Sequence, residues 1–410
     1  MSAIEIANIV ETKRADILNL LKKLVQTPSP TGQEGDLARL LRQEMMAKGL
    51  DATIDSVGNV VGTLEGNARG EGRSLLYNAH MDHVPPGTMA EPYSAKLRDG
   101  KQFGLEGEVL YGRGTSDMKG ALAAMVMAGS ILNEMGLKLK GDLIITGTVF
   151  EEELGNIGPP ALVDIDGLRP DAAVVGECTN LDVAYGNRGV VRTKLTTFGK
   201  SAHVSVQERG VNALYKMAKV LDRIQETNLT LPSHPILGKA SWAVCRLDIT
   251  PNTVNVVPNR CDAVVDTRIV PGFTPEMVLE EQRKIIGAME QDPEFEAEVN
   301  LVEKDAETWT GYRFRLRPSV PSFYIPTDHW LVNAASDSIG KILGRQANRR
   351  VWGFTTESHC FMERHIPTIG FGPGEERFTH SEREVVSVEE VVTATKAYAM
   401  LAVDLCGLQS

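Results

Sequence analysis

Hydrophobic positions recur every three or four residues near the start of the chain and then give way to short apolar runs. The spacing predicts a helix over residues 13–26 and a second over 36–49, where Gly49 ends it. The later apolar runs are bounded by turn residues, as buried strands are, and alternate with helical periodicity. They are VGNVVGTL, SLLYNAH, the helix from Lys119 to about Met135, DLIITGTV and DAAVVGE. This alternation predicts an α/β fold with a mixed, largely parallel sheet sandwiched by helices.

The pattern changes at about Gly189. From there, amphipathic strands predominate, and helical stretches at 211–225 and 275–289 lie between them. This indicates an inserted α+β unit that has its own sheet. Helical periodicity returns from roughly residue 306, together with one buried strand, PTIGFG. We therefore predict one domain built from residues 1–187 and 306–410, interrupted by a second of residues 188–305.

Composition and charge narrow the classes of protein that fit. The chain has 410 residues, of which 42% are hydrophobic and 24% charged, and its formal net charge is −11. No basic footprint exists for nucleic acid or an anionic membrane surface, so neither is expected as the main partner. The longest uncharged apolar stretch, residues 120–132, is too short to span a bilayer. Five scattered cysteines without a C-x-x-C pair favour a reducing, cytoplasmic location.

Side chains of the types that bind metal ions occur in or just after loops at five predicted strand ends. They are His80 with Asp82, Asp117, the run Glu151–Glu152–Glu153, Glu177 and His380. Taken singly, each fits a core histidine, a solvated turn or a helix start. The set is more informative, because five separate loops would have to carry such residues by chance. Two imidazoles with several carboxylates and no thiolate suit zinc, cobalt or manganese.

Seven short stretches, spread over nearly the whole chain, have the form of motifs. They are HMDHVPPG (80–87), GRGTSDMKG (112–120), FEEELG (150–155), GECT (176–179), GKSAHVS (199–205), NVVPNRCDAVVDTR (255–268) and GFGPG…H (370–380). In these stretches and their order the chain resembles the zinc-dependent aminoacylase / acetylornithine deacetylase / succinyl-diaminopimelate desuccinylase / glutamate carboxypeptidase family. The resemblance implies a zinc-exopeptidase-like catalytic domain, an inserted ferredoxin-like lid or dimerisation domain, and a homodimer.

The resemblance also implies a site for two divalent metal ions, most simply Zn²⁺, with Co²⁺ or Mn²⁺ as alternatives. Asp117 matches the carboxylate that bridges both metals. His80 and Glu177 would complete one metal, and Glu152 and His380 the other. Two divalent ions carry +4 and three carboxylates return −3, which leaves charge to hold a hydroxide.

Three further residues surround this set. Asp82 lies two positions from His80, so in an extended segment both project to the same side. We expect its carboxylate to accept the imidazole N–H and fix the ligating tautomer. Glu151 matches the general base of the family, although Glu153 leaves a second register open, with Glu152 as base and Glu153 as ligand. No family role matches His83, which is either structural or faces the substrate.

Positions in the inserted domain match substrate contacts of the family: His203, Asn255 and Arg268. In dimeric relatives the equivalent of His203 reaches the partner's active site, and an arginine suits a substrate carboxylate. One departure concerns specificity. The chain has WGFTTESHCF (352–361) where relatives often carry a Gly-Thr-Asp loop, so the substrate cannot be transferred from any well-known member.

The expected activity is a cytoplasmic two-metal hydrolase that cleaves the amide bond of an N-acyl amino acid or related small carboxylate. A dipeptidase or carboxypeptidase would use the same chemistry on a peptide, and hydrolysis of another C–N bond is a more distant alternative. A catalytically inactive metal-binding relative is the alternative from another class. No ligand and no general base is missing from the sequence, which argues against it.

Overall fold

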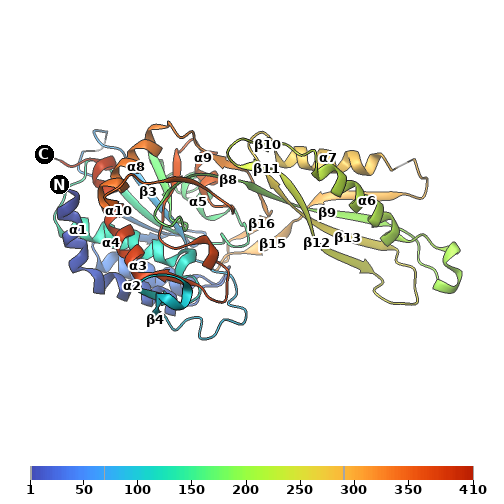
Figure 1. Ribbon diagram of the computed structural model, residues 1–410, viewed down its shortest axis with the longest axis horizontal. Helices are drawn as coiled ribbons and strands as arrows, with labels where there is room; N and C mark the ends of the chain where they lie inside the picture. Colours follow the sequence, from blue (N-terminus) through green and yellow to red (C-terminus); the bar gives the residue numbers. More distant parts are fainter. Residues whose placement is uncertain (1, 69, 290, 410) are drawn as a thin grey trace.

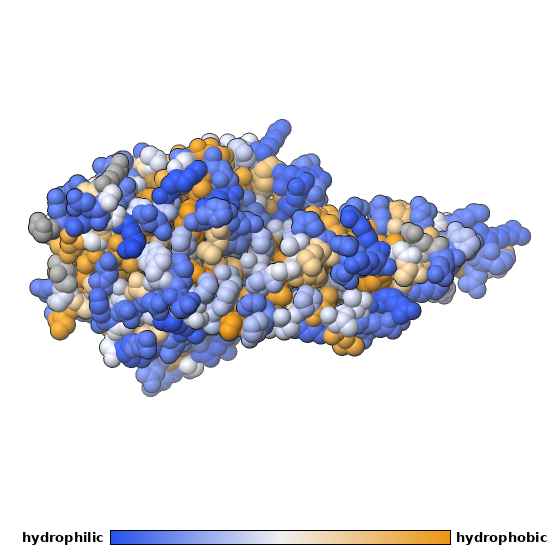
Figure 2. Space-filling view, turned by 90° about the horizontal axis from the view of Figure 1, so that it is seen from above, coloured by the Kyte–Doolittle hydropathy of each residue, from blue (hydrophilic) through white to orange (hydrophobic). Residues whose placement is uncertain are grey.

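A wide body and a narrower extension make up the molecule (Figure 1). The computed structural model describes residues 2–68, 70–289 and 291–409. Figure 2 shows the same two parts from above, with polar side chains covering the outer end of the extension. The body contains a nine-stranded sheet, and the extension contains a separate sheet.

The sheet of the body is mixed, as predicted. Its order is β1-β2-β6-β3-β7-β20-β8-β18, and β19 also pairs with β8. The central run β6-β3-β7-β20 is parallel, whereas β2 joins β6 and β20 joins β8 in antiparallel fashion. The parallel part is therefore the centre of the sheet. The strands are β1 (Asp51–Ile54), β2 (Val60–Leu64), β3 (Leu75–His80), β6 (Leu143–Thr148), β7 (Ala172–Val175), β8 (Val183–Asn187), β18 (Phe323–Tyr324), β19 (Arg349–Trp352) and β20 (Thr368–Gly370).

Helices cover both faces of this sheet, which confirms the predicted sandwich. Because successive side chains of a strand point to opposite faces, neighbouring residues of β3 enter different cores. Leu75 and Tyr77 belong to the core with α4 and α10, whereas Leu76 packs with Val163 and Phe361 of α5 and α9. The helices are α1 (Ala3–Thr12), α2 (Arg14–Gln26), α3 (Gly35–Ala47), α4 (Gly120–Glu134), α5 (Gly158–Asp164), α8 (Trp330–Leu343), α9 (Ser358–Met362) and α10 (Val388–Cys406).

The extension has the element order β-α-β-β-α-β. Its strands lie in the order β12-β13-β9-β14, and every neighbouring pair is antiparallel. This is the arrangement of a ferredoxin-like unit. The sheet buries one face against its helices, since alternate residues of β13 are buried. The elements are β9 (Gly189–Phe198), α6 (Ala213–Asn228), β12 (Ser241–Thr250), β13 (Arg260–Ile269), α7 (Pro275–Gly287) and β14 (Glu296–Leu301).

Three short strands connect the extension back to the body. The hairpin of β15 (Lys304–Glu307) and β16 (Arg313–Leu316) follows β14, and β17 (Ser319–Val320) then pairs with β9. The boundary expected between residues 305 and 306 thus falls inside β15, and the domain limits stay a prediction. All five cysteines are free thiols, as expected. Among the described residues, no helix is both long and apolar enough to cross a membrane.

Candidate metal centre

Three of the predicted ligand segments converge because their strands are parallel neighbours. His80 is the last residue of β3, which lies between β6 and β7. The loop with Glu151 and Glu152 follows β6, and Glu177 follows β7. Parallel strands deliver the residues after their carboxyl ends to the same edge of a sheet. The strand order therefore explains why these residues, far apart in sequence, meet.

Asp117 occupies the centre of the cluster. It lies in the irregular helical turn Thr115–Lys119 that precedes α4. Its Oδ1 is 2.9 Å from Nε2 of His80, and its Oδ2 is 3.1 Å from Nε2 of His380. Each carboxylate oxygen thus faces a different imidazole. This is the geometry expected of a carboxylate shared between two cations.

Glu177 and Glu152 lie on opposite sides of Asp117. Glu177 Oε1 is 3.5 Å from Nε2 of His80, and Glu152 Oε2 is 2.9 Å from Nε2 of His380. Glu177 Oε2 is buried and has no hydrogen-bond partner among the described residues. Such an orphaned buried oxygen is costly unless a ligand satisfies it. The donor set therefore fits hard or borderline divalent cations.

The electrostatics of the cluster also call for cations. Burial raises the pKa of Glu152 and of Glu177 to about 7 each. Hydrogen bonds to Asp117 and Glu152 raise the pKa of His380 to about 11. Buried carboxylates this close repel one another, and opposite charge between them removes that repulsion. The imidazole of His380, whose side chain is 54% exposed, leaves the cluster open to solvent on that side.

Glu151 lies beside the cluster. Atoms of His80, Glu151 and Glu177 that could ligate a metal lie within 4.8 Å of one another. Burial raises the pKa of the Glu151 carboxyl well above its usual range. Glu153 points elsewhere, because its Oε2 pairs with Nζ of Lys304 at 2.5 Å. The geometry thus supports the register in which Glu151 and Glu152 belong to the site.

The carboxylate of Asp82 does not hold the His80 imidazole as predicted. Nδ1 of His80 lies 2.9 Å from the backbone carbonyl oxygen of Asp82, while the carboxylate is 3.6 Å away. The chain leaves β3 at His80, so the extended geometry behind the prediction does not apply. The carboxylate instead accepts the backbone N–H groups of Glu151 at 3.1 Å and Glu152 at 3.0 Å, and the hydroxyl of Thr31 at 2.8 Å. Asp82 thus positions the loop that carries Glu151 and Glu152.

Sequence reasoning missed two further buried carboxylates that hold this site. Glu34 Oε1 accepts the backbone N–H of Phe150 at 3.2 Å, next to the amides that Asp82 holds. Glu384 Oε1 accepts the backbone N–H of Asp117 at 3.1 Å, and its Oε2 pairs with Arg113 at 2.5 Å. Glu34 is the last residue of the segment TPSPTGQE (27–34), which separates the first two predicted helices. In that segment only the break in helical periodicity was informative. No pattern in the sequence marked Glu384.

His83 has a structural role. Its Nε2 accepts the backbone N–H of Ser29 at 3.0 Å, and its Nδ1 lies 2.8 Å from the carbonyl oxygen of Val84. A backbone N–H can only donate, so Nε2 must be unprotonated and the ring neutral. Burial lowers the pKa of His83 to about 4, in agreement with that tautomer.

The residues predicted to contact substrate do not lie together in the folded extension. His203 and Asn255 are exposed neighbours, since Val204 N–H donates to the carbonyl oxygen of Asn255 at 3.3 Å. Both lie in loops beyond the end of the sheet at which Phe198 pairs with Arg260, since His203 follows β9 and Asn255 precedes β13. Arg268 lies eight positions further along β13, or about 27 Å at 3.4 Å per residue. There its Nε pairs with Asp266 Oδ1 at 2.9 Å.

Fold and donor set together define a metal-binding α/β hydrolase. The sequence model of peptidase family M20/M25/M40 matches residues 76–404, and the chain belongs to this family. It is 31% identical over 395 residues to the uncharacterized protein YgeY of Escherichia coli K12, which covers 95% of this chain and 94% of that protein. The protein is accordingly a hydrolase that acts on amide or peptide bonds.

Other relatives agree on the family and the fold. A succinyl-diaminopimelate desuccinylase of Gluconacetobacter diazotrophicus is 27% identical over 416 residues, covering 95% of this chain and 97% of that enzyme. The solved structure of the Bacillus subtilis YxeP protein, a dinuclear metal-binding peptidase of the M20 family, superposes with a TM-score of 0.70. It is 16% identical and covers 96% of this chain and 98% of that one, so it supports the fold alone.

Proposed function

We propose that the protein is a two-metal amidohydrolase that removes the acyl group from an N-acyl amino acid or a related small carboxylate. His80 and Glu177 would hold one divalent ion, Glu152 and His380 the other, and Asp117 would bridge both. Zinc suits this donor set, and cobalt or manganese are alternatives. The observation that carries the proposal is the arrangement of Asp117, whose two oxygens face two different imidazoles at 2.9 and 3.1 Å.

Glu151 would carry the proton in this reaction. When bound, two divalent ions lower the pKa of a water molecule and polarise the substrate carbonyl. Glu151 would accept a proton from that water and donate it to the nitrogen of the leaving amine. Burial raises its pKa above the ordinary range of a carboxyl group, which suits a group that must both take and return a proton. Asp82 and Glu34 hold the backbone of its loop and keep the carboxylate in place.

Substrate contacts from the extension would come from two subunits. A span of about 27 Å along β13 separates Arg268 from the end that carries His203 and Asn255. One substrate cannot bridge that distance, so we assign Arg268 to its own subunit's site. His203 and Asn255 would reach the site of the partner in a homodimer. The edge strand β12 offers a surface for that contact, since Val244 and Leu247 are 40% and 45% exposed.

We also propose that the enzyme is cytoplasmic and acts on small molecules. The support for the cytoplasmic location is the five unpaired cysteines, four of them buried, which suit a reducing compartment. The functional proposal does not depend on this location.

The test of the proposed function is a metal-resolved substrate screen. The protein is stripped of metal, reloaded separately with zinc, cobalt and manganese, and analysed for metal content. Each form is then assayed on N-acetyl amino acids and on dipeptides. We expect about two metal ions per chain and hydrolysis of N-acyl amino acids. Activity without stoichiometric metal would refute the mechanism, and hydrolysis of dipeptides alone would replace the deacylase with a dipeptidase.

A further inference from the structure

A small cavity has Glu151 in its lining. Its volume is about 10 Å³. This is room for about one group of the size of a water molecule. The lining includes Glu151, Asn156, Thr355, Thr356, Glu357 and His359. Four of these residues belong to the stretch WGFTTESHCF (352–361), in which the sequence analysis finds a departure from the family.

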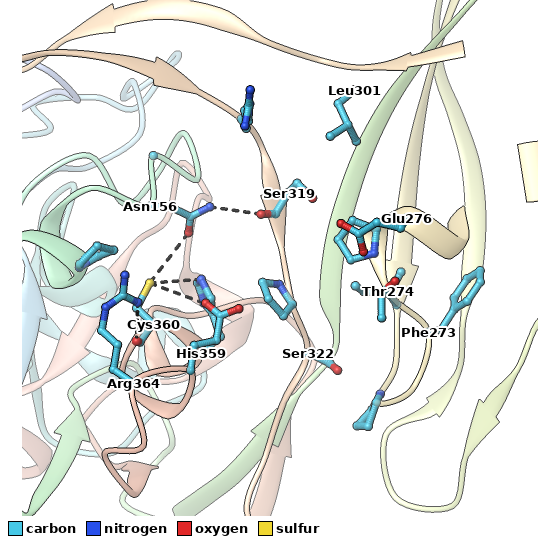
Figure 3. Close-up of a pocket in the computed structure, with 18 of the residues that line it drawn as sticks. Asn156, Phe273, Thr274, Glu276, Leu301, Ser319, Ser322, His359, Cys360 and Arg364 are labelled. Carbon is cyan, nitrogen blue, oxygen red and sulfur yellow. Dashed lines mark hydrogen bonds between the residues drawn. The ribbon is translucent and has the colours of Figure 1, made fainter. Parts of the chain in front are cut away.

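The small cavity adjoins a much larger pocket of about 920 Å³ between the body and the extension. Gly155, Asn156, His359 and Cys360 line both spaces. Figure 3 shows Asn156, His359 and Cys360 grouped on one wall of the larger pocket, with residues of the extension such as Thr274 and Phe273 opposite. A substrate in the larger pocket can therefore place one terminal group in the small cavity.

Glu357 is a buried residue whose two hydrogen bonds from the sheet both reach one carboxylate oxygen. The residue is 6% exposed. Its Oε2 accepts hydrogen bonds from Asn78 of β3 and Thr148 of β6, both at 2.7 Å. Its Oε1 accepts no hydrogen bond from the described residues. No lysine, arginine or histidine nitrogen forms an ion pair with Glu357 in this part of the chain. Burial raises the pKa of Glu357 to about 7.

The rest of the lining offers acceptors and no cation. His359 is neutral, because burial lowers its pKa to about 4, and its Nδ1 lies 3.0 Å from the carbonyl oxygen of Thr356. Its Nε2 is then an acceptor, and it lies 3.2 Å from Sγ of Cys360, whose thiol can donate to it. The hydroxyls of Thr355 and Thr356 donate elsewhere, to Arg188 and Asn187. A group that enters this cavity meets two carboxylates, and it gains most if it is a small cation with several donors.

We propose that this cavity is a subsite for a single ammonium group of the substrate and that Glu357 is the residue that selects it. The inference rests on the proposed amide hydrolysis and adds the class of substrate: an amide that carries a primary amine close to the scissile bond. An ammonium group has the size of one water molecule and three donors, which match the carboxylates of Glu357 and Glu151 and the amide oxygen of Asn156 in the lining. A substrate carboxylate in the same place would face like charge.

The test uses two pairs of substrates in which a methyl group replaces the ammonium at nearly constant shape. Nα-acetylornithine and N-acetylnorleucine differ on the amino-acid side of the amide. Glycylleucine and propionylleucine differ on the acyl side. The wild-type enzyme, loaded with metal, should prefer the ammonium member of at least one pair by about tenfold or more in kcat/KM. Equal kcat/KM within both pairs would overturn the inference, whatever any variant does.

Glu357→Gln then assigns the preference. Both hydrogen bonds from the sheet reach Oε2, so the amide oxygen of glutamine can accept them and the fold is kept. We expect kcat/KM for the ammonium substrate to fall about tenfold, with that for the methyl partner within about twofold. An equal fall for both partners would show a merely structural role and refute the assignment. Glu363→Gln, an exposed carboxylate on the larger pocket, is the matched control and should change neither value.

Failure of the subsite and failure of the proposed function give different experimental results. If the methyl substrates are hydrolysed as fast as the ammonium substrates, only the subsite is wrong. If none of the four substrates is hydrolysed by the metal-loaded enzyme, the proposed function fails and the subsite with it.

Discussion

Glu384 accepts a hydrogen bond from the backbone N–H of Asp117 at 3.1 Å, although 267 positions separate the two residues. Asp117 owes its place partly to this contact. Glu384 directly precedes β21 (Val385–Ser387), which pairs with β5 (Glu108–Tyr111). The small sheet therefore holds both ends of the interaction, and it connects the central carboxylate of the metal centre to a distant part of the chain.

Replacing Glu384 should destabilise the protein strongly. Arg113 is buried, and Glu384→Ala leaves its guanidinium without the carboxylate at 2.5 Å. An uncompensated buried charge of this kind costs about 3–5 kcal/mol. Urea unfolding measures the loss in the free energy of unfolding. Glu389→Ala removes a surface partner of Arg14 and should cost less than about 1 kcal/mol. Equal losses in the two variants would contradict this account.

Three single substitutions separate the roles in the Glu151–Glu152–Glu153 run. Glu151→Gln should keep both metal ions and lower kcat by about 10² to 10⁴, because it removes proton transfer and spares coordination. Glu152→Gln should lower the metal content toward one ion per chain. Glu153→Gln should change neither, since Glu153 pairs with Lys304. Metal analysis and steady-state kinetics decide, and loss of metal in the Glu153 variant would restore the other register.

Asp82 should affect the site through the loop it holds. Asp82→Ala removes the acceptor for the amides of Glu151 and Glu152, so the base and one ligand lose their fixed position. Groups that orient ligands in this way are worth about 10–100-fold in metal affinity or activity. Thr31→Val removes only the hydroxyl that donates to the same carboxylate and should have a smaller effect on metal affinity, measured by competition with a chelator. Unchanged affinity in the Asp82 variant would refute the role.

His83 predicts a stability loss in mild acid. Its pKa is about 4 in the folded protein, against an ordinary value of 6.5. Between these values the unfolded chain binds a proton that the folded protein does not, so the free energy of unfolding falls as pH falls. The full shift corresponds to about 3 kcal/mol. Urea unfolding at several pH values from 7.5 to 4.5 measures the slope. His83→Asn should be less stable at pH 7.5 and have a shallower slope, whereas an identical slope would contradict the prediction.

Mixing two inactive variants tests the role of His203 across subunits. Glu151→Gln inactivates the site of its own chain, and His203→Ala would impair the site of the partner. A mixed dimer then carries both defects in one site and none in the other. After subunit exchange at equal amounts, about a quarter of wild-type activity should return. No recovery, in a sample shown to contain mixed dimers, would place His203 in its own subunit's site.

The candidate ligands could be predicted from the sequence because each one belongs to a recognisable strand end or motif. His80 is the last residue of the run SLLYNAH, and Glu177 is the last residue of DAAVVGE. Parallel strands bring such ends together whatever their separation along the chain. The ferredoxin-like unit was equally legible, since its long amphipathic strands alternate buried and exposed positions, as β13 does.

The features that could not be predicted from the sequence depend on contacts between distant segments, which no local pattern encodes. Glu384 is a single acid between a turn and a short strand, and only the pairing of β21 with β5 brings it to Asp117. The strands β18 and β19 are two and four residues long, too short for periodicity to reveal. The misplaced bond of Asp82 has a similar origin. Its side chain direction was inferred from strand geometry, and the strand stops two residues earlier.

The order in which the cluster's residues appear along the chain has a consequence for biosynthesis. A ribosome finishes β14, and with it the last long strand of the extension's sheet, about eighty residues before it reaches His380. The extension can therefore acquire its structure on the nascent chain, while the cluster still lacks one imidazole. The proposed pair of cations can therefore be held by all of its ligands only when translation is nearly over.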